Sequence, residues 1–136
     1  MRYAAALVVA LVGCAGLDTV TGTTLYVGTY TATAFGITPA GQSAIDVLAA
    51  GGSLSITITK NGSTTGLLNL PSSVTGGAPV MASMAGTAEI TGLTVQFQQT
   101  ADTFVRDLVW SRIEGVLMVA ELSVGGATYN IALVRQ

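Results

Sequence analysis

Apolar and polar residues alternate along most of the chain after residue 24, with a period of two. In Ser53–Lys60, three aliphatic residues alternate with serine and threonine, and Leu93–Gln99 repeats this spacing. Because successive side chains of a strand point to opposite faces, the apolar residues of each segment share one face. The pattern therefore predicts strands that bury one face and expose the other.

Eight strands are predicted, separated by glycine-rich or polar turns. Their ranges are Thr24–Phe35, Ser53–Lys60, Ser63–Leu70, Ala85–Thr91, Leu93–Gln99, Leu108–Ile113, Val116–Ser123 and Ala127–Arg135. Asn61–Gly62 predicts a two-residue type I′ hairpin turn, and a change of phase at Gly28–Thr29 predicts a bulge or bend in the first strand. Asp46–Ala50, followed by two glycines, predicts one helical turn.

Most of these strands are joined by connections short enough for antiparallel neighbours. The class predicted is all-β, and the architecture is an eight-stranded antiparallel up-and-down β-barrel. Closure into a barrel also removes the exposed edges of the sheet. A two-sheet β-sandwich uses the same signals and is the alternative.

The first fourteen residues differ from the rest of the chain. Arg2 is followed by the apolar run Tyr3–Gly13 and by Cys14. A helix over this run would reach about 16 Å, half of the ~30 Å bilayer core, so it is too short to span. Leu11-Val12-Gly13-Cys14 resembles the lipobox of bacterial lipoprotein signals.

That resemblance implies a signal peptide over residues 1–13, a lipidated Cys14 with a tether over 14–23, and a barrel domain over 24–136. It also implies attachment to a membrane of the bacterial cell envelope. Ala15 stands where an aspartate would favour the inner membrane, so the resemblance implies the outer membrane. An ordinary secretory signal, or an uncleaved start with a buried cysteine, is the alternative.

A second resemblance concerns the barrel itself. Gly28-Thr29-Tyr30 is similar to the Gly-x-Trp motif of lipocalins, with tyrosine in place of tryptophan, and Arg135 matches the basic residue near the end of their last strand. Residues 46–54, followed by the turn Lys60-Asn61-Gly62, resemble small bacterial lipocalin-like proteins. The resemblance implies a lipocalin-like barrel in which Gly28, Tyr30 and Arg135 have the structural role of closing it.

Charge and composition exclude several functions. Removing Arg2 with the signal leaves four Lys and Arg residues against seven Asp and Glu, a net charge of −3, so no nucleic-acid partner is expected. The chain has no histidine, and Cys14 is its only cysteine. Nucleophilic systems that need histidine are therefore absent, and no cofactor or metal is predicted. A hydrolase that pairs Glu89 with Glu121 remains a third hypothesis, but the sequence favours a protein that is not an enzyme.

The leading functional hypothesis is a cell-envelope lipoprotein whose barrel binds or carries a small hydrophobic ligand. Its candidate lining residues are Leu54, Ile56, Ile58, Val95, Phe97, Trp110, Tyr129 and Ile131. Each of them is equally well a packed core residue, because alternation shows only that they face inward. The alternative is a structural or protein-interaction lipoprotein with a solid barrel core and no ligand.

Overall fold

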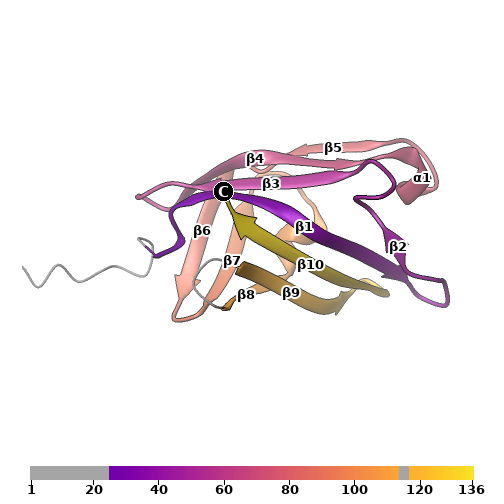
Figure 1. Cartoon of the computed structure of the whole chain (residues 1–136). Helices are drawn as coiled ribbons and strands as arrows, with labels where there is room; N and C mark the ends of the chain where they lie inside the picture. Colours follow the sequence, from indigo (N-terminus) through magenta and orange to yellow (C-terminus); the bar gives the residue numbers. More distant parts are fainter. Residues whose placement is uncertain (1–24, 114–116) are drawn as a thin grey trace, which may run out of the picture.

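The computed structural model describes residues 25–113 and 117–136 and consists mainly of β-strands (Figure 1). The predicted signal peptide, Cys14 and the tether lie outside the described residues. Eight strands form the barrel: β1 (Gly28–Pro39), β3 (Ser53–Ile58), β4 (Ser63–Leu70), β6 (Gly86–Thr91), β7 (Thr94–Gln99), β8 (Val109–Ile113), β9 (Leu117–Val124) and β10 (Ala127–Arg135). Four short elements interrupt this series: β2 (Ile45–Asp46), α1 (Ser72–Thr75), β5 (Val80–Ser83) and α2 (Phe104–Asp107).

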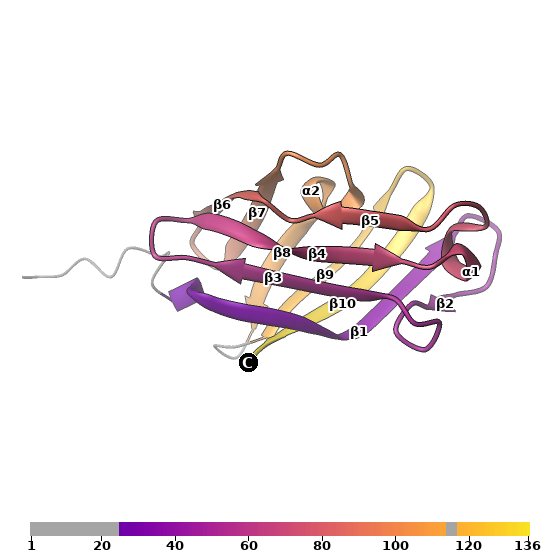
Figure 2. The same cartoon turned by 90° about the horizontal axis from the view of Figure 1, so that it is seen from above.

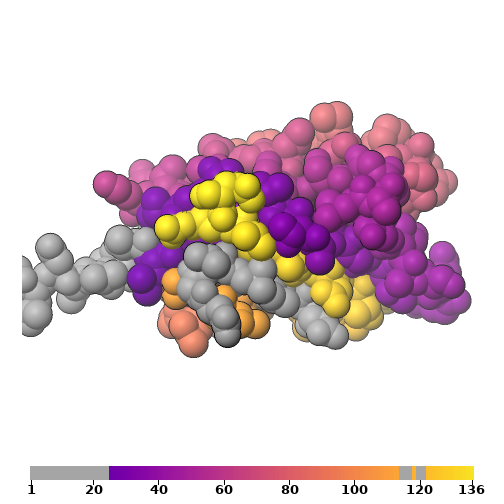
Figure 3. All heavy atoms as spheres, in the orientation of Figure 1, coloured from indigo at the N-terminus to yellow at the C-terminus, as the bar shows by residue number. Residues whose placement is uncertain are grey.

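The barrel strands pair in sequence order, all antiparallel, and β10 returns to pair with β1. Figure 3 shows the C-terminal residues lying against the first strand, and Figure 2 shows β1, β3 and β4 crossing in front of β8–β10. One sheet thus closes on itself. The predicted all-β barrel is confirmed, and the alternative of a two-sheet sandwich does not apply. Its shortest seam joins β4 to β6 through only two residue pairs, Ser63 with Thr87 and Thr64 with Gly86.

The first strand is bent, but not where the sequence predicted. Tyr26, Tyr30 and Ala32 are all buried, so no change of phase occurs at Gly28–Thr29. The pairing with β10 shifts instead between Ala32 and Ala34, after which Phe35 is buried. The predicted change of phase at Gly28–Thr29 is therefore wrong. The bulge lies within a run of alternating threonine and alanine, where the small residues do not reveal which face is buried.

The turn between β3 and β4 also differs from its prediction. The N–H of Gly62 donates to the carbonyl of Thr59 at 3.0 Å, and the N–H of Thr59 donates to the carbonyl of Ser63 at 2.9 Å. These bonds enclose a three-residue loop, Lys60–Gly62, in which Gly62 has a left-handed φ of 82°. The predicted two-residue type I′ turn is wrong, because the left-handed glycine follows the turn instead of forming its second corner.

Strand β4 changes neighbour along its length. Its first residues pair with β6 and its last four with β5, and the N–H of Met84 donates to Gly66 O at 3.0 Å between them. Gly66 has a φ of 137°, and a Cβ there would collide with the backbone oxygen of Ser55. The predicted fourth strand, Ala85–Thr91, corresponds to β6. Strand β5 was not among the predicted strands.

The two ends of the barrel are built differently. The end here called the Leu25 end comprises Leu25–Gly28, the Thr59–Ser63 hairpin, the Thr91–Thr94 turn, Ile113 and Arg135–Gln136. At the opposite α2 end, Phe104 of α2 stacks on Tyr129 at 4.4 Å between ring centroids and lies 5.9 Å from Phe35. Val105 and Leu108 are fully buried there, so α2 plugs this end with apolar side chains.

Candidate functional site

The eight predicted lining residues do face the interior, but they pack against one another. Seven of them are at most 1 % exposed, and Tyr129 is half-buried. Side chains that lined a ligand-sized cavity would keep accessible area, because a water-sized probe would fit inside. Leu54, Phe97 and Trp110 have none. In this structure these residues are core, as in close-packed protein interiors.

Aromatic side chains fill much of this core. Trp110 meets Phe97 edge-on, with 5.7 Å between the ring centroids. The indole N–H of Trp110 donates to the carbonyl of Val105 at 3.3 Å, which ties β8 to α2. Trp110 thus has a structural partner for its only polar group, and its ring is fully buried in the core.

The predicted closure residues do come together. Tyr30 pairs with Arg135 across β1 and β10, and a Cβ on Gly28 would lie 2.7 Å from Cδ of Arg135. Gly28 has a φ of 147°, which a residue with a side chain rarely adopts. The absence of a side chain also leaves room for the side chain of Arg135. Burial raises the pKa of the Tyr30 hydroxyl, and the guanidinium of Arg135 partly opposes this rise.

A second arginine–tyrosine pair at the same end escaped the sequence analysis. The guanidinium carbon of Arg112 lies 5.6 Å from the centre of the Tyr26 ring. Burial raises the pKa of the Tyr26 hydroxyl, and Arg112 opposes this rise. Tyr26 lies two residues before Gly28, where the sequence placed a change of phase. A change of phase at that point would place Tyr26 and Tyr30 on opposite faces, whereas both are buried.

Two buried polar side chains of the interior differ in their hydrogen bonding. Thr64 is 2 % exposed, and its hydroxyl donates to Met84 O at 2.8 Å. Gln99 is 4 % exposed at the α2 end of β7, and among the described residues neither its Oε1 nor its Nε2 has a hydrogen-bond partner. A buried amide without partners is costly. Gln99 is therefore an exceptional residue of this core, and the sequence analysis did not single it out.

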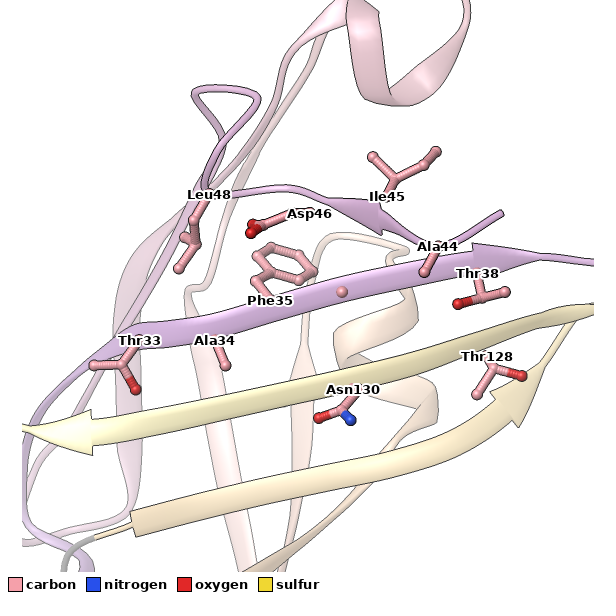
Figure 4. Close-up of a pocket in the computed structure, with 11 residues that line it drawn as sticks. Thr33, Ala34, Phe35, Thr38, Ala44, Ile45, Asp46, Leu48, Thr128 and Asn130 are labelled. Carbon is pink, nitrogen blue, oxygen red and sulfur yellow. The ribbon is translucent and has the colours of Figure 1, made fainter. Parts of the chain in front are cut away.

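One pocket of the described structure lies outside the lumen. A groove of about 610 Å³ runs along the outer side of β1, β10 and β2 (Figure 4). None of the eight predicted lining residues borders it. Its lining comprises Thr33, Ala34, Phe35, Gly36, Thr38, Ala44, Ile45, Asp46, Leu48, Thr128 and Asn130.

The bulge in β1 and the turn after β2 shape this groove. The bulge places two consecutive residues, Thr33 and Ala34, on the outer face. The carboxylate of Asp46 accepts the N–H of Ala49 at 3.1 Å, and the Ala50 N–H donates to Asp46 O at 3.1 Å. These bonds form the single turn predicted for Asp46–Ala50. The turn fixes the wall of the groove that contains Leu48. The sequence predicted the turn but not the groove beside it.

The chemistry of the groove suits binding. Thr33, Thr38, Thr128 and Asn130 supply hydroxyl and amide groups, and Asp46 is the one carboxylate of its lining. A mechanism with two acids therefore has no second acid in this groove. Glu89 is exposed on β6, and the side chain of Glu121 lies outside what the structure describes. Within the described part of the chain, no cluster of three metal-ligating side chains occurs.

Comparison of the chain with protein-family models, curated proteins and solved structures found no match. Within residues 25–113 and 117–136, no helix has the length and apolar character required to cross a bilayer. The class defined here is therefore that of the fold: an antiparallel β-barrel with a packed interior and an external groove.

Proposed function

We propose that this protein is a non-catalytic, lipid-anchored interaction module of the bacterial cell envelope, with a solid barrel core. The lipobox-like segment ending at Cys14 supports the anchor. The observation that carries the solid core is that seven of the eight predicted lining residues are at most 1 % exposed. Function then depends on the outer surface of the barrel.

The groove along β1 and β10 is the proposed binding surface, and its partner is a protein segment. Its threonines and Asn130 offer hydrogen-bonding groups that can meet a polypeptide backbone. Asp46 would favour a basic side chain in the partner, since a carboxylate accepts charge-assisted hydrogen bonds. Ile45 and Leu48 add apolar contact along one wall.

Site-specific photocrosslinking in envelopes tests this proposal. A photoreactive residue at Thr128, in the groove, should give a discrete and saturable protein adduct. The same residue at Leu122, exposed on neighbouring β9, should not. The adduct should be lost when Asp46 is replaced by Lys and retained when Asp102, another exposed carboxylate, is replaced by Lys. Equal adducts from Thr128 and Leu122 would contradict a specific groove.

The anchor is tested separately by Cys14→Ser. Mass spectrometry of the natural chain should show acyl chains on Cys14 and no residues 1–13, and the protein should sediment with membranes. The serine variant should carry no acyl chain, because the thiol is the acylated group. A natural chain without acyl chains would contradict the anchor but would leave the groove proposal to the crosslinking result.

Carriage of a small hydrophobic ligand is the second candidate, and Gln99 is the observation that favours it. A ligand with a polar end could satisfy the buried amide if α2 swung away, while its apolar body replaced Phe104 and Val105. Native mass spectrometry of the full chain should then show a bound small molecule that is lost in Gln99→Met. Absence of any bound molecule would count against this candidate.

A further inference from the structure

We propose that two copies of this protein pair edge to edge through β5, as antiparallel strands related by a two-fold axis. This surface is distinct from the groove, and the pairing does not depend on the proposed anchor or on the groove's partner. Three features of β5 support it: an unpaired backbone edge, an arrangement of free groups that is complementary to itself, and a lack of charge that would repel a second copy.

Strand β5 pairs on one side only. It pairs with the last four residues of β4, and no other described strand pairs with it (Figure 2). The N–H of Met84 donates to Gly66 O, so the backbone of residue 84 points to β4. Because backbone groups alternate in direction along a strand, those of Ala82 also point to β4, and those of Met81 and Ser83 point away. Among the described residues, these two donors and two acceptors have no backbone partner.

The free edge is short and complementary to itself. Pro79 has no N–H to extend it on one side, and on the other side Ala85 O already accepts the N–H of Thr100 at 3.0 Å. A two-fold axis midway between Met81 and Ser83 would place Met81 of each copy opposite Ser83 of the other. Each such pair exchanges two hydrogen bonds, so all four free groups of each copy would be satisfied.

No charge near β5 opposes a second copy. Residues 61–88 contain no charged residue. Near a two-fold axis a charged side chain meets its own equivalent, and charged residues protect many natural sheet edges from pairing in this way. Asp46 on β2, Glu89 on β6 and Glu121 on β9 each lie in a stretch that lacks a neighbouring strand on one side. Those edges carry a carboxylate, and β5 does not.

An exposed apolar side chain lies on the free edge itself. Met81 is 69 % exposed, and Leu67, which pairs with Ser83 across β4 and β5, is 41 % exposed on the same face. In the two-fold arrangement the two Met81 side chains are diagonal neighbours, a spacing that long side chains can bridge. Pairing would therefore bury Met81 of both copies. Four-residue strands bury less than the about 1,200–2,000 Å² of stable complexes, so the expected dimer is weak.

Disulfide trapping in the full chain captures a weak dimer and tests its register. Every variant carries Cys14→Ser, which removes the only natural cysteine. Met81→Cys and Ser83→Cys are prepared separately and then mixed under mild oxidation. Opposite residues of a hydrogen-bonded pair are about 5.5 Å apart at Cα, within the range of a disulfide, whereas diagonal residues are about 7–8 Å apart. The mixture should therefore give a disulfide-linked dimer in several-fold higher yield than either variant alone.

Leu67→Cys is the matched control, because it is exposed on the same face but lies one strand behind the edge. It should give no more dimer than random collision. If the mixture gives no dimer, or no more than Leu67→Cys or the single variants give, the pairing through β5 is overturned.

A charge exchange separates pairing from a general effect of the substitutions. Met81→Cys with Ser83→Lys, mixed with Ser83→Cys with Met81→Lys, places two lysines opposite each other and should abolish the disulfide. Replacing Met81→Lys by Met81→Glu in the second chain places a glutamate opposite the lysine and should restore it. Equal yields from the two mixtures would contradict the proposed register.

Discussion

The two ends of the barrel are closed by different means. At the Leu25 end, hydrogen-bonded turns and two arginine–tyrosine pairs join strands that are far apart in the sequence. At the α2 end, a short helix inserts Phe104 and Val105, and within the described part of the chain the buried Gln99 amide has no hydrogen-bond partner. The Tyr26 hydroxyl at the first end donates a hydrogen bond, whereas the Gln99 amide at the second has no hydrogen-bond partner among the described residues. A change at each end should therefore affect stability in a different direction.

The largest effect is expected from Trp110, which joins the core to the plug. Trp110→Ala should lower the free energy of unfolding by about 3–5 kcal/mol, because it removes a buried aromatic side chain and leaves a cavity. Urea unfolding followed by circular dichroism measures this. Leu93→Ala, at an exposed position, should change stability by less than about 0.5 kcal/mol. Similar losses in the two variants would mean that the core is not closely packed.

At the Leu25 end, Gly28→Ala should lower the free energy of unfolding by about 1–3 kcal/mol, because it forces an unfavourable φ and displaces Arg135. Gly36→Ala is the control in the same strand, since its Cβ would meet its nearest atom at an ordinary 3.7 Å. Thermal unfolding of both variants checks the prediction. Equal stability of the two would show that Gly28 does not constrain closure.

At the α2 end, Gln99→Met should raise the free energy of unfolding by about 1–3 kcal/mol, because it removes a buried amide that has no partner. Thr64→Val should lower it by about 1 kcal/mol, since that hydroxyl is bonded to Met84 O. Chemical unfolding of this pair tests whether a buried polar group with a hydrogen bond and one without affect stability in opposite directions. A loss in both variants would show that the Gln99 amide has a partner in solution, such as bound water.

The smallest effect concerns alkaline pH. Burial raises the folded-state pKa of Tyr26, Tyr30 and Tyr129 above the ordinary value of 10.0, and for Tyr129 Asp107 raises it further. Their stabilisation is fully present below pH 10, because the unfolded chain ionises first. It is lost as the pH rises through the folded-state values. Urea midpoints should fall above pH 10, and more gently in Tyr129→Phe. A midpoint that is constant in this range would contradict the raised values.

The sequence predicted the strands well where large apolar residues alternate. The range Ala127–Arg135 is reproduced for β10, where Tyr129, Ile131 and Leu133 mark one face, and the range Ser63–Leu70 is reproduced for β4. The bulge in β1 was misplaced, because threonine and alanine alternate there and either face could be buried. The neighbour change at Gly66 was missed, since it depends on the backbone of Ser55 on another strand.

Less of the candidate site than of the fold could be predicted from the sequence. Inward-facing residues such as Leu54 and Phe97 were identified correctly, but alternation could not show whether the space between them is empty or filled. The external groove depends on a bulge, a two-residue strand and the side chains of β10, which come together only in three dimensions. Gln99 continues the inward-facing alternation of Val95 and Phe97, so the period of two indicated its face but not that its amide has no hydrogen-bond partner among the described residues.

The pairing of β1 with β10 also has a consequence for folding. The hydrogen bond from Arg135 to Val27 O joins residues that are 108 positions apart. Contacts of such long sequence separation close late and slow the folding of β-proteins. One edge of β1 must stay unpaired until β10 has been synthesised and, in an exported chain, translocated. The time between the emergence of these two strands is therefore the period when the protein is most exposed to pairing with other chains.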